Sequence, residues 1–365
     1  MDDRVYEHAE TLVDWSARIE RGENVVMTVS EGAHDLAVAT AEVLGERGAN
    51  LVSLYRSAEL GRAYLTGHDD EFDSDPAHEL ALYENADSVL ILGGGWNAAA
   101  MADVPGERQS AFSRSQQAIR EARMDTDWVS TVHPTRAMAQ QAGMSFPEYQ
   151  DFVYNAVLRD WQSLAEEMGQ LKEILDGGTA VRIVAGDTDL TMSIENRTAV
   201  NSAASVAYDS HNLPSGEVFT APENPEGTVV FDVPMTIRGQ RVQEVRLEFE
   251  DGEVVDYSAG MGESVIGEVL ETDAGAKRLG ELGIGMNRGI DRPTDSILFD
   301  EKMAETVHLA LGRAYDSCLP EGESGNESAV HVDLITSMDE GSRIEVDGEV
   351  IQRDGKFRWE DEFPA

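Results

Sequence analysis

Apolar and polar positions alternate through the first half of the chain in blocks that are typical of strands separated by helices. Short apolar runs at residues 23–30, 49–56, 86–95 and 127–135 predict strands, and the periodic stretches between them predict amphipathic helices. Strands that are joined in this way by helices form parallel sheets. We therefore expect an α/β fold that begins with a parallel-sheet βαβ domain.

Helical periodicity continues over residues 145–175 and meets a double glycine at Gly177 and Gly178. Glycine is a common helix stop, so we place a domain boundary here. The expected organisation is an N-terminal α/β domain with a helical connection at 1–177, followed by a C-terminal catalytic domain at 178–365.

The second half of the chain has a different pattern, with many strands and few helices. Arg-Gly and Asp-Gly turns between alternating segments predict a meander and terminal hairpins. The sequence predicts an α+β, metal-binding domain with strands at 179–195, 216–222, 228–260, 328–336 and 343–359, and helices at 263–279 and 300–315.

Charge changes this picture more than any other property of the composition. The chain of 365 residues carries 70 acidic and 28 basic side chains, a formal net charge of −42. Binding of nucleic acid through a basic face is excluded, because phosphate contacts need clustered Lys and Arg. Acidity spread along periodic apolar segments favours a halophilic protein, whose self-repulsion dense salt screens, over an acidic mesophilic enzyme.

Cysteine usage and hydropathy limit the environment and the kinds of site. The single cysteine, Cys318, excludes an internal disulfide and a Cys-rich zinc site. The start, "MDDRVYEHAE", has no apolar signal core, and no apolar run approaches the ~18 residues of a membrane span. We expect a cytoplasmic protein that does not enter a membrane.

A run of glycines, Gly93, Gly94 and Gly95, closes the third predicted strand. A dinucleotide fingerprint needs its glycines after the first strand of the unit, where this chain has "SEGAHD" with only one glycine. We interpret the run as a loop at the end of a parallel strand.

His331 and Asp333 lie two positions apart in the apolar run "SAVHVDLIT". Residues i and i+2 of a strand face the same side, so an imidazole and a carboxylate would lie together. Such a pair forms half of the ligand shell of a divalent metal ion. The alternative is a hydrogen-bonded pair in a core.

The predicted helix at 300–315 adds further donors. Glu301, Glu305 and His308 are spaced i, i+4 and i+7, which places them on one helical face, and Tyr315 shares that face. These residues extend the metal-ligand set, or else the acids form a solvated face and His308 belongs to the core.

Two acids stand in apolar surroundings: Glu217 in "LPSGEVFTAP" and Glu281 in "RLGELGIGMN". A carboxylate in such a setting must be paired or bind a cation. Carboxylates and imidazoles without cysteine suit a pair of divalent ions, an arrangement used for hydrolysis. The choice among Zn, Co, Mn and Mg stays open.

Four blocks, "LPSGEVFTAP", "RLGELGIGMN", "ILFDEKMAETVHLALGRAY" and "SAVHVDL", resemble in this order the signature blocks of the thermophilic aminopeptidase family (aminopeptidase T-like, M29). "RGENVVMTVS", "ERGANLVSLY" and "HPTRAMAQQAGMSFPEYQDF" resemble its N-terminal domain, so the resemblance covers nearly the whole chain.

The resemblance implies a homodimeric exopeptidase that removes N-terminal residues from peptides with two metal ions. It implies the metal ligands Glu217, Glu281, Glu301, His308, His331 and Asp333. It also implies that Tyr315 lies in the active site, where it stabilises the oxyanion. For the mechanism, we expect Glu217 or Glu281 to handle the proton.

The sequence departs from the family pattern at two places. Glu305 stands where the family has a small residue, and the stretch "MSIENRTAVNSAASVAYDSHN" lacks the expected glycine and tryptophan.

Two other functions fit the same residues. One is a different metal-dependent amide hydrolase, such as a deacylase or carboxypeptidase. The other is a non-enzymatic acidic protein that binds cations for solubility.

Overall fold

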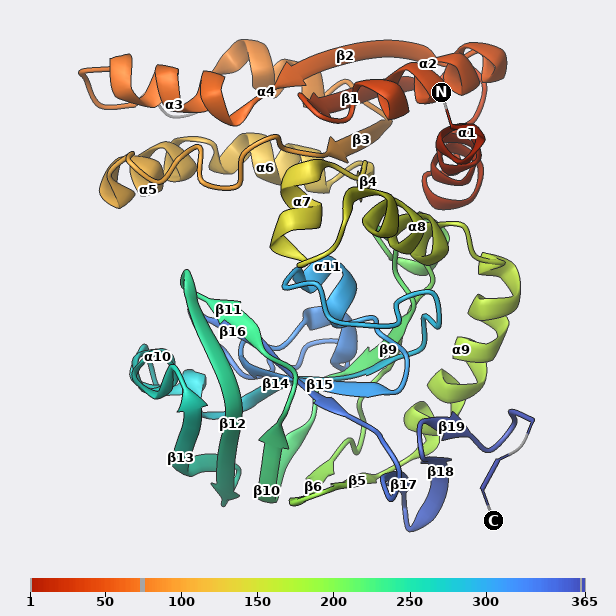
Figure 1. Ribbon diagram of the computed structural model, residues 1–365, viewed down its shortest axis with the longest axis vertical. Coiled ribbons are helices and arrows are strands. Elements are labelled where there is room, and N and C mark those ends of the chain that lie inside the picture. Colours follow the sequence, from red (N-terminus) through yellow and green to blue (C-terminus); the bar gives the residue numbers. More distant parts are fainter. Residues whose placement is uncertain (1, 73–75, 362, 365) are drawn as a thin grey trace. The chain divides into compact units, whose positions relative to one another are not determined.

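The computed structural model describes residues 2–72, 76–361 and 363–364. The chain forms two compact units, the first from residues 1–159 and 204–214, the second from 160–203 and 215–365 (Figure 1). Helix α9 (Trp161–Gly177) ends at the double glycine, as the sequence predicts, and belongs to the second unit. The division into functional domains at residue 177 stays a prediction.

The first unit is built on a parallel sheet with strand order β2-β1-β3-β4-β8. This confirms the expected βαβ architecture. The strands are β1 (Asn24–Ser30), β2 (Asn50–Arg56), β3 (Ser88–Gly93), β4 (Asp127–Val132) and β8 (Asn212–Leu213). The helices are α1 (Asp3–Glu10), continued by a π-helical turn at Thr11–Ser16, α2 (His34–Arg47), α3 (Ala58–Gly67), α4 (Ala77–Tyr83), α5 (Gly106–Ser115), α6 (Gln117–Met124), α7 (Arg136–Gln141) and α8 (Phe146–Val157).

Local sequence signals explain the helix ends of this unit. The side chains of Ser57, Thr135 and Ser145 accept hydrogen bonds from backbone N–H groups in the first turns of α3, α7 and α8. Helix α2 ends at Arg47 and is capped by Gly48, whose φ of 80° suits glycine. The glycine run begins at the last residue of β3 and meets the segment after β1, where Gly32 N–H donates to the carbonyl of Gly94 over 2.8 Å.

The second unit contains two antiparallel sheets. The larger has the order β11-β12-β10-β6-β5-β17-β18-β19, with β13 paired to β12, and includes the predicted meander and terminal hairpins. Its strands are β5 (Ala180–Ala185), β6 (Thr188–Ser193), β10 (Glu223–Phe231), β11 (Met235–Ile237), β12 (Gln240–Glu250), β13 (Glu253–Met261), β17 (Arg343–Val346), β18 (Glu349–Arg353) and β19 (Lys356–Phe357).

The smaller sheet has the order β16-β15-β14-β9-β7 and carries most of the candidate site residues. Strands β14 and β15 lie inside this sheet and are buried along their whole length. Its strands are β7 (Val200–Ser202), β9 (Glu217–Thr220), β14 (Leu279–Gly285), β15 (Thr306–Gly312) and β16 (His331–Ser337).

The prediction of a helix at 300–315 is wrong. A short helix, α11 (Ile297–Asp300), ends where it was predicted to begin, and residues 306–312 form β15. A central strand that is buried on both faces has an unbroken apolar run, which periodicity cannot distinguish from a helix. The helix expected at 263–279 is also too long, because α10 (Glu263–Leu270) ends at residue 270 and a 3₁₀ turn follows at Gly275–Lys277.

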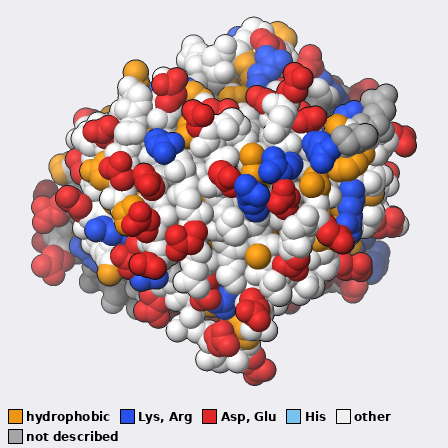
Figure 2. Space-filling model, turned by 90° about the horizontal axis from the view of Figure 1, so that it is seen from below, with side chains coloured by type: hydrophobic (Ala, Val, Ile, Leu, Met, Phe, Trp, Pro, Cys, Tyr) orange, Lys and Arg blue, Asp and Glu red, His pale blue; other side chains and the backbone are white. Residues whose placement is uncertain are grey.

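Acidic side chains are scattered over the face shown in Figure 2, among fewer basic ones, and do not gather in one patch. This distribution agrees with the spread of acids along the sequence. Among the helices that the structure describes, none combines the length and apolar character needed to cross a membrane.

Candidate metal centre

Six residues that the sequence singled out converge within the second unit. Four neighbouring strands and the segment after α11 supply them, so antiparallel pairing brings together residues more than 100 positions apart. They are Glu217 on β9, Glu281 on β14, His308 on β15, His331 and Asp333 on β16, and Glu301 directly after α11.

Close contacts connect five of these residues in a chain. His308 Nε2 lies 3.6 Å from Glu217 Oε2 and 3.1 Å from Glu281 Oε1. His331 Nε2 lies 3.3 Å from Glu281 Oε2 and 3.5 Å from Asp333 Oδ1. Both oxygens of Glu281 therefore face an imidazole, and Glu281 stands at the centre of the cluster.

The donors fit divalent metal ions. Ligand atoms of Glu281, His331 and Asp333 all lie within 4.8 Å of one another. Glu217 Oε2 and Asp333 Oδ1 are buried without a hydrogen-bond partner, which is costly for carboxylate oxygens unless a cation binds them. Oxygen and imidazole donors without thiolate suit Zn, Co, Mn or Mg.

The orientation of His331 also fits a residue that binds a metal ion. Its Nδ1 lies 2.8 Å from the carbonyl oxygen of Arg313, which can only accept a hydrogen bond, so Nδ1 carries the proton. In the neutral ring that a metal ion would require, Nε2 then presents its lone pair toward Glu281 and Asp333, whereas the protonated ring donates from Nε2 to these carboxylates. The second-sphere hydrogen bond from Nδ1 is the usual way in which proteins orient a histidine that binds a metal.

The fold places His308 by leaving room for its ring. His308 pairs with Gly283 across β14 and β15, and a Cβ atom on Gly283 would overlap Cε1 and Nε2 of the imidazole. Only glycine at residue 283 is compatible with this ring position. Gly216, with φ of 112°, has a similar role before Glu217, because a Cβ there would lie 2.8 Å from Cβ of Asn287.

A buried lysine completes the cluster. Lys302 is 0% exposed, and its Nζ lies 3.4 Å from Glu217 Oε1 and in contact with Glu301 Oε1. Its backbone carbonyl accepts from Asn287 N–H over 3.1 Å, and the Asn287 side chain donates to Ser215 O over 2.8 Å. Asn287 thus connects the segments that carry Lys302 and Glu217.

The turn before α11 is held by Asp300. Its carboxylate accepts hydrogen bonds from Thr294 N–H at 2.7 Å, Thr294 Oγ1 at 2.8 Å and Ser296 N–H at 3.2 Å. Burial raises the pKa of Asp300 to about 6, although these hydrogen bonds oppose the shift. This turn fixes the position from which Glu301 and Lys302 reach the site.

Burial and mutual charge shift the titration of the cluster. Burial raises the pKa of Glu217 to about 8, although Lys302 opposes the shift. Burial also disfavours the charged form of Glu281, but hydrogen bonds with His308 and His331 outweigh it and lower the pKa to about 2. The same carboxylates overcome burial at the two imidazoles and raise the pKa of His308 to about 9 and of His331 to about 11.

Tyr315 lies beside the cluster but not on the helical face predicted for it. It follows β15, is 46% exposed, and its ring centroid lies 4.9 Å from that of His331 and 5.6 Å from that of Phe219. Its ring is therefore held against a candidate ligand while part of the side chain stays open to solvent.

Glu305 lies outside the cluster. Its backbone adopts a φ of 62°, and its carboxylate forms an ion pair with Arg288 over 2.7 Å. The prediction that Glu305 shares a helical face with Glu301 and His308 is therefore wrong.

Sequence reasoning missed Lys302, Gly283 and Asn287. Lys302 had a signal, because it is one of four lysines in the chain and stands between two acids in "FDEKMAE". Gly283 had a weaker one, since glycine inside an apolar strand often marks close approach of another group. Asn287 had none, because its role depends on two loops meeting in space.

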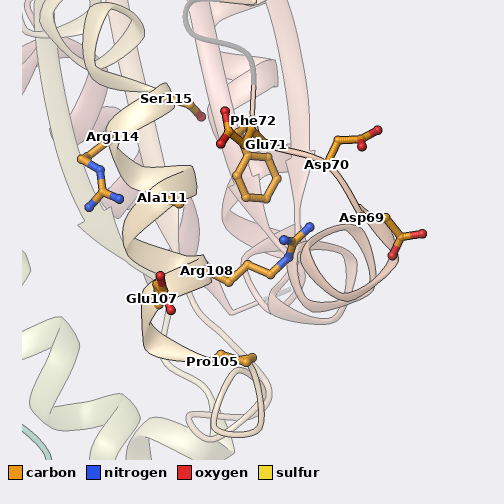
Figure 3. A pocket seen from close by; sticks show the side chains of 10 residues that line it. All are labelled: Asp69, Asp70, Glu71, Phe72, Pro105, Glu107, Arg108, Ala111, Arg114 and Ser115. Atoms are coloured by element: carbon orange, nitrogen blue, oxygen red, sulfur yellow. The ribbon is translucent and has the colours of Figure 1, made fainter.

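The N-terminal unit has a separate cavity of about 710 Å³ between α5 and the segment at 69–72, which follows α3 (Figure 3). Arg108 extends toward that segment, 5.0 Å from the centroid of the Phe72 ring, while Arg114 points away from it. Its lining mixes acids and arginines, and the hydroxyl of Ser115, which also lines it, donates to the carbonyl of Phe112 over 2.8 Å. The catalytic candidates therefore stay with the carboxylate and histidine cluster.

Comparisons with known proteins show to which family this chain belongs. The family model for thermophilic metalloproteases (M29) matches residues 1–357. Aminopeptidase T of Thermus aquaticus is 29% identical over 384 residues, covering 93% of each chain. Aminopeptidase AmpS of Bacillus subtilis is 25% identical, covering 96% of this chain and 95% of its own.

A solved structure gives the same answer for the fold. Wild-type AmpT from Thermus thermophilus matches with a TM-score of 0.85 and 26% identity, covering 98% of this chain and 99% of that one. The expected α/β fold class and the metallo-aminopeptidase class of hydrolase are confirmed. The chain belongs to the thermophilic metalloprotease family M29, as its sequence motifs predicted.

Proposed function

We propose that this chain is an aminopeptidase that uses two divalent metal ions to release N-terminal residues from peptides. The observation that carries the proposal is the joining of two imidazoles by the two oxygens of Glu281, at 3.1 and 3.3 Å. A carboxylate placed between two separate ligand groups can bridge two ions. The proposed ligands are Glu217, Glu281, Glu301, His308, His331 and Asp333.

When bound, the ions supply Lewis acidity for the peptide carbonyl and a water of lowered pKa. The residues around them orient the reactants. Glu281 has both oxygens engaged by histidines, whereas Glu217 has Oε1 near Lys302 and Oε2 without a hydrogen bond. We therefore assign transfer of the proton from water to the leaving amine to Glu217 and not to Glu281.

Tyr315 is proposed to stabilise the developing oxyanion through its phenolic hydrogen. Burial, followed by the nearby carboxylates, raises the pKa of this phenol, so it keeps its proton at neutral pH. Packing of the ring against His331 restrains the hydroxyl beside the cluster. The partly exposed position leaves room for a substrate carbonyl.

The deciding experiment is an activity screen on aminoacyl amides with chelator-treated protein. Zn, Co, Mn and Mg are added back in turn, at low salt and in molar NaCl. Each amide is paired with its N-acetylated form. An aminopeptidase hydrolyses only the amide whose α-amine is free. Preference for the acetylated form would identify a deacylase and overturn the proposal.

The ligand assignment has its own test. His331→Ala should lose metal and turnover while keeping its far-UV circular dichroism. A variant with full activity and full metal content would refute the assignment. If the wild-type chain binds metal ions only weakly and without saturation, the non-enzymatic alternative of an acidic cation-binding protein is favoured.

We further propose a homodimer that works in the cytoplasm at high salt. The family resemblance supports the homodimer, and the single cysteine supports a location in the cytoplasm. The formal net charge of −42 supports function at high salt. Light scattering in molar NaCl tests the dimer, with a mass near one chain as the contradicting result.

A further inference from the structure

The cluster contains a cation of its own, and that cation lies at one end only. Lys302 is fully buried and pairs with Glu217 and Glu301. Lysine is almost never fully buried unless it is paired. In the part of the chain that the structure describes, its ion pairs leave out Glu281 and Asp333, which face the histidines.

Around Glu281, whose two oxygens face the two histidines, this arrangement places the other donors in two unlike groups. Glu281, His331 and Asp333 present donor atoms within 4.8 Å of one another. Glu217 and Glu301 have one oxygen each committed to the ammonium, with His308 Nε2 3.6 Å from the other oxygen of Glu217. An ion in this second group must share its carboxylates with Lys302 and tolerate a like charge nearby.

We propose that Lys302 is a positioning residue that makes the two metal positions unequal. This inference rests on the proposed two-ion function. The ammonium holds Glu217 Oε1 and Glu301 so that Glu217 Oε2 stays aimed at the centre. It thereby weakens the ion that Glu217, Glu301 and His308 would share with the bridging Glu281, while the ion that Glu281 would share with His331 and Asp333 binds tightly.

Zinc titration of the chelator-treated chain by calorimetry tests the inference. Wild type should bind two ions with dissociation constants that differ by at least about tenfold, as expected for a unit charge near the second ion. Lys302→Met removes the charge at nearly constant length. It should tighten the weaker constant at least about tenfold and leave the tighter one within about threefold.

Lys277→Met is the matched control, because the substitution is the same but Lys277 is exposed. Both constants should stay at their wild-type values. Two equal constants in wild type, or a parallel shift of both constants in Lys302→Met, would overturn the inference and leave the two-ion enzyme intact. Failure of wild type to bind a second ion would instead refute the proposed function.

A measurement on wild type keeps the inference testable if Lys302→Met does not fold. The chain has only four lysines, so ¹⁵N-lysine labelling gives four ammonium groups to follow: Lys172, Lys277, Lys302 and Lys356. The Lys302 signal should move during the second equivalent of zinc and not during the first. Movement with the first equivalent, or none at all, would contradict the assignment.

Discussion

The imidazole of His308 lies against Gly283, its partner across β14 and β15. The absence of a side chain at residue 283 is what allows a histidine inside a fully buried strand to reach Glu281. Gly283→Ala should therefore displace the ring and reduce metal affinity by about tenfold to a hundredfold, the loss typical of disturbing the support of a metal ligand.

Gly177→Ala is the control for this change, since a Cβ there meets nothing within 4 Å. Equilibrium dialysis with zinc measures the affinity of each variant. Unchanged zinc affinity in Gly283→Ala would show that His308 is not a ligand.

Removal of the Tyr315 hydroxyl should affect turnover alone. Tyr315→Phe keeps the ring that packs on His331, so metal content and KM should stay unchanged. The kcat should fall by about 10²–10³-fold, the cost of losing one oxyanion donor. Tyr257→Phe, an exposed tyrosine on β13, should match wild type. Loss of metal together with kcat would mean that Tyr315 supports the fold of the site instead.

Two acids only four positions apart should behave differently. Glu301→Gln removes a proposed ligand that also contacts Lys302, so it should weaken one of two bound ions by at least about tenfold. Glu305→Gln breaks only a half-exposed pair with Arg288, and should cost under about 1 kcal/mol of stability with no change in metal affinity. Metal analysis and thermal unfolding of both variants decide the matter. Equal metal loss in both would contradict the placement of Glu305.

These two acids also show where sequence reasoning reached its limit. The parallel sheet, the meander and the strand that carries His331 and Asp333 all follow from patterns within about ten residues. The secondary structure of residues 306–312 does not follow from such local patterns, because the neighbouring strands on both sides decide it. Glu301 and His308 were chosen with a wrong helical face, yet both reach the cluster because tertiary pairing brings them there.

A buried histidine in the first unit should make stability depend on acid. Burial, followed by the charge of His133, lowers the pKa of His8 to about 3 from 6.5 in the unfolded chain. The unfolded state thus binds a proton that the folded state excludes between these values. The neutral His8 ring therefore contributes fully to the free energy of unfolding above pH 6.5. This contribution is lost as the pH falls toward 3, by about 1.4 kcal/mol per pH unit.

His8→Gln can keep the contact that His8 Nε2 makes with Thr131 Oγ1 at 2.7 Å but cannot take up the proton. Urea unfolding from pH 7 to 5 should therefore give a flatter curve for His8→Gln than for wild type. Exposed His78→Gln should follow wild type. Parallel curves for wild type and His8→Gln would show that His8 is not buried as a neutral ring.

Salt should stabilise the protein by screening. With a formal net charge of −42, the folded chain repels itself, and the Debye length falls from about 10 Å at 0.1 M to about 3 Å at 1 M salt. The Tm should rise through this range in NaCl. Sorbitol at matched osmolality separates screening from exclusion of solute, and an equal rise in sorbitol would argue against the electrostatic cause.

The pairing of β14, β15 and β16 also limits how the length of this chain can change. Each candidate ligand on these strands is placed by its register against a neighbour, as in His308 opposite Gly283 and Ile335. Inserting or deleting one residue inside β15 would turn His308 to the opposite side of the sheet. Tolerated insertions should instead fall in the exposed stretch at 321–324, before Asn326, whose side chain donates to the carbonyl of Gly312 at the end of β15.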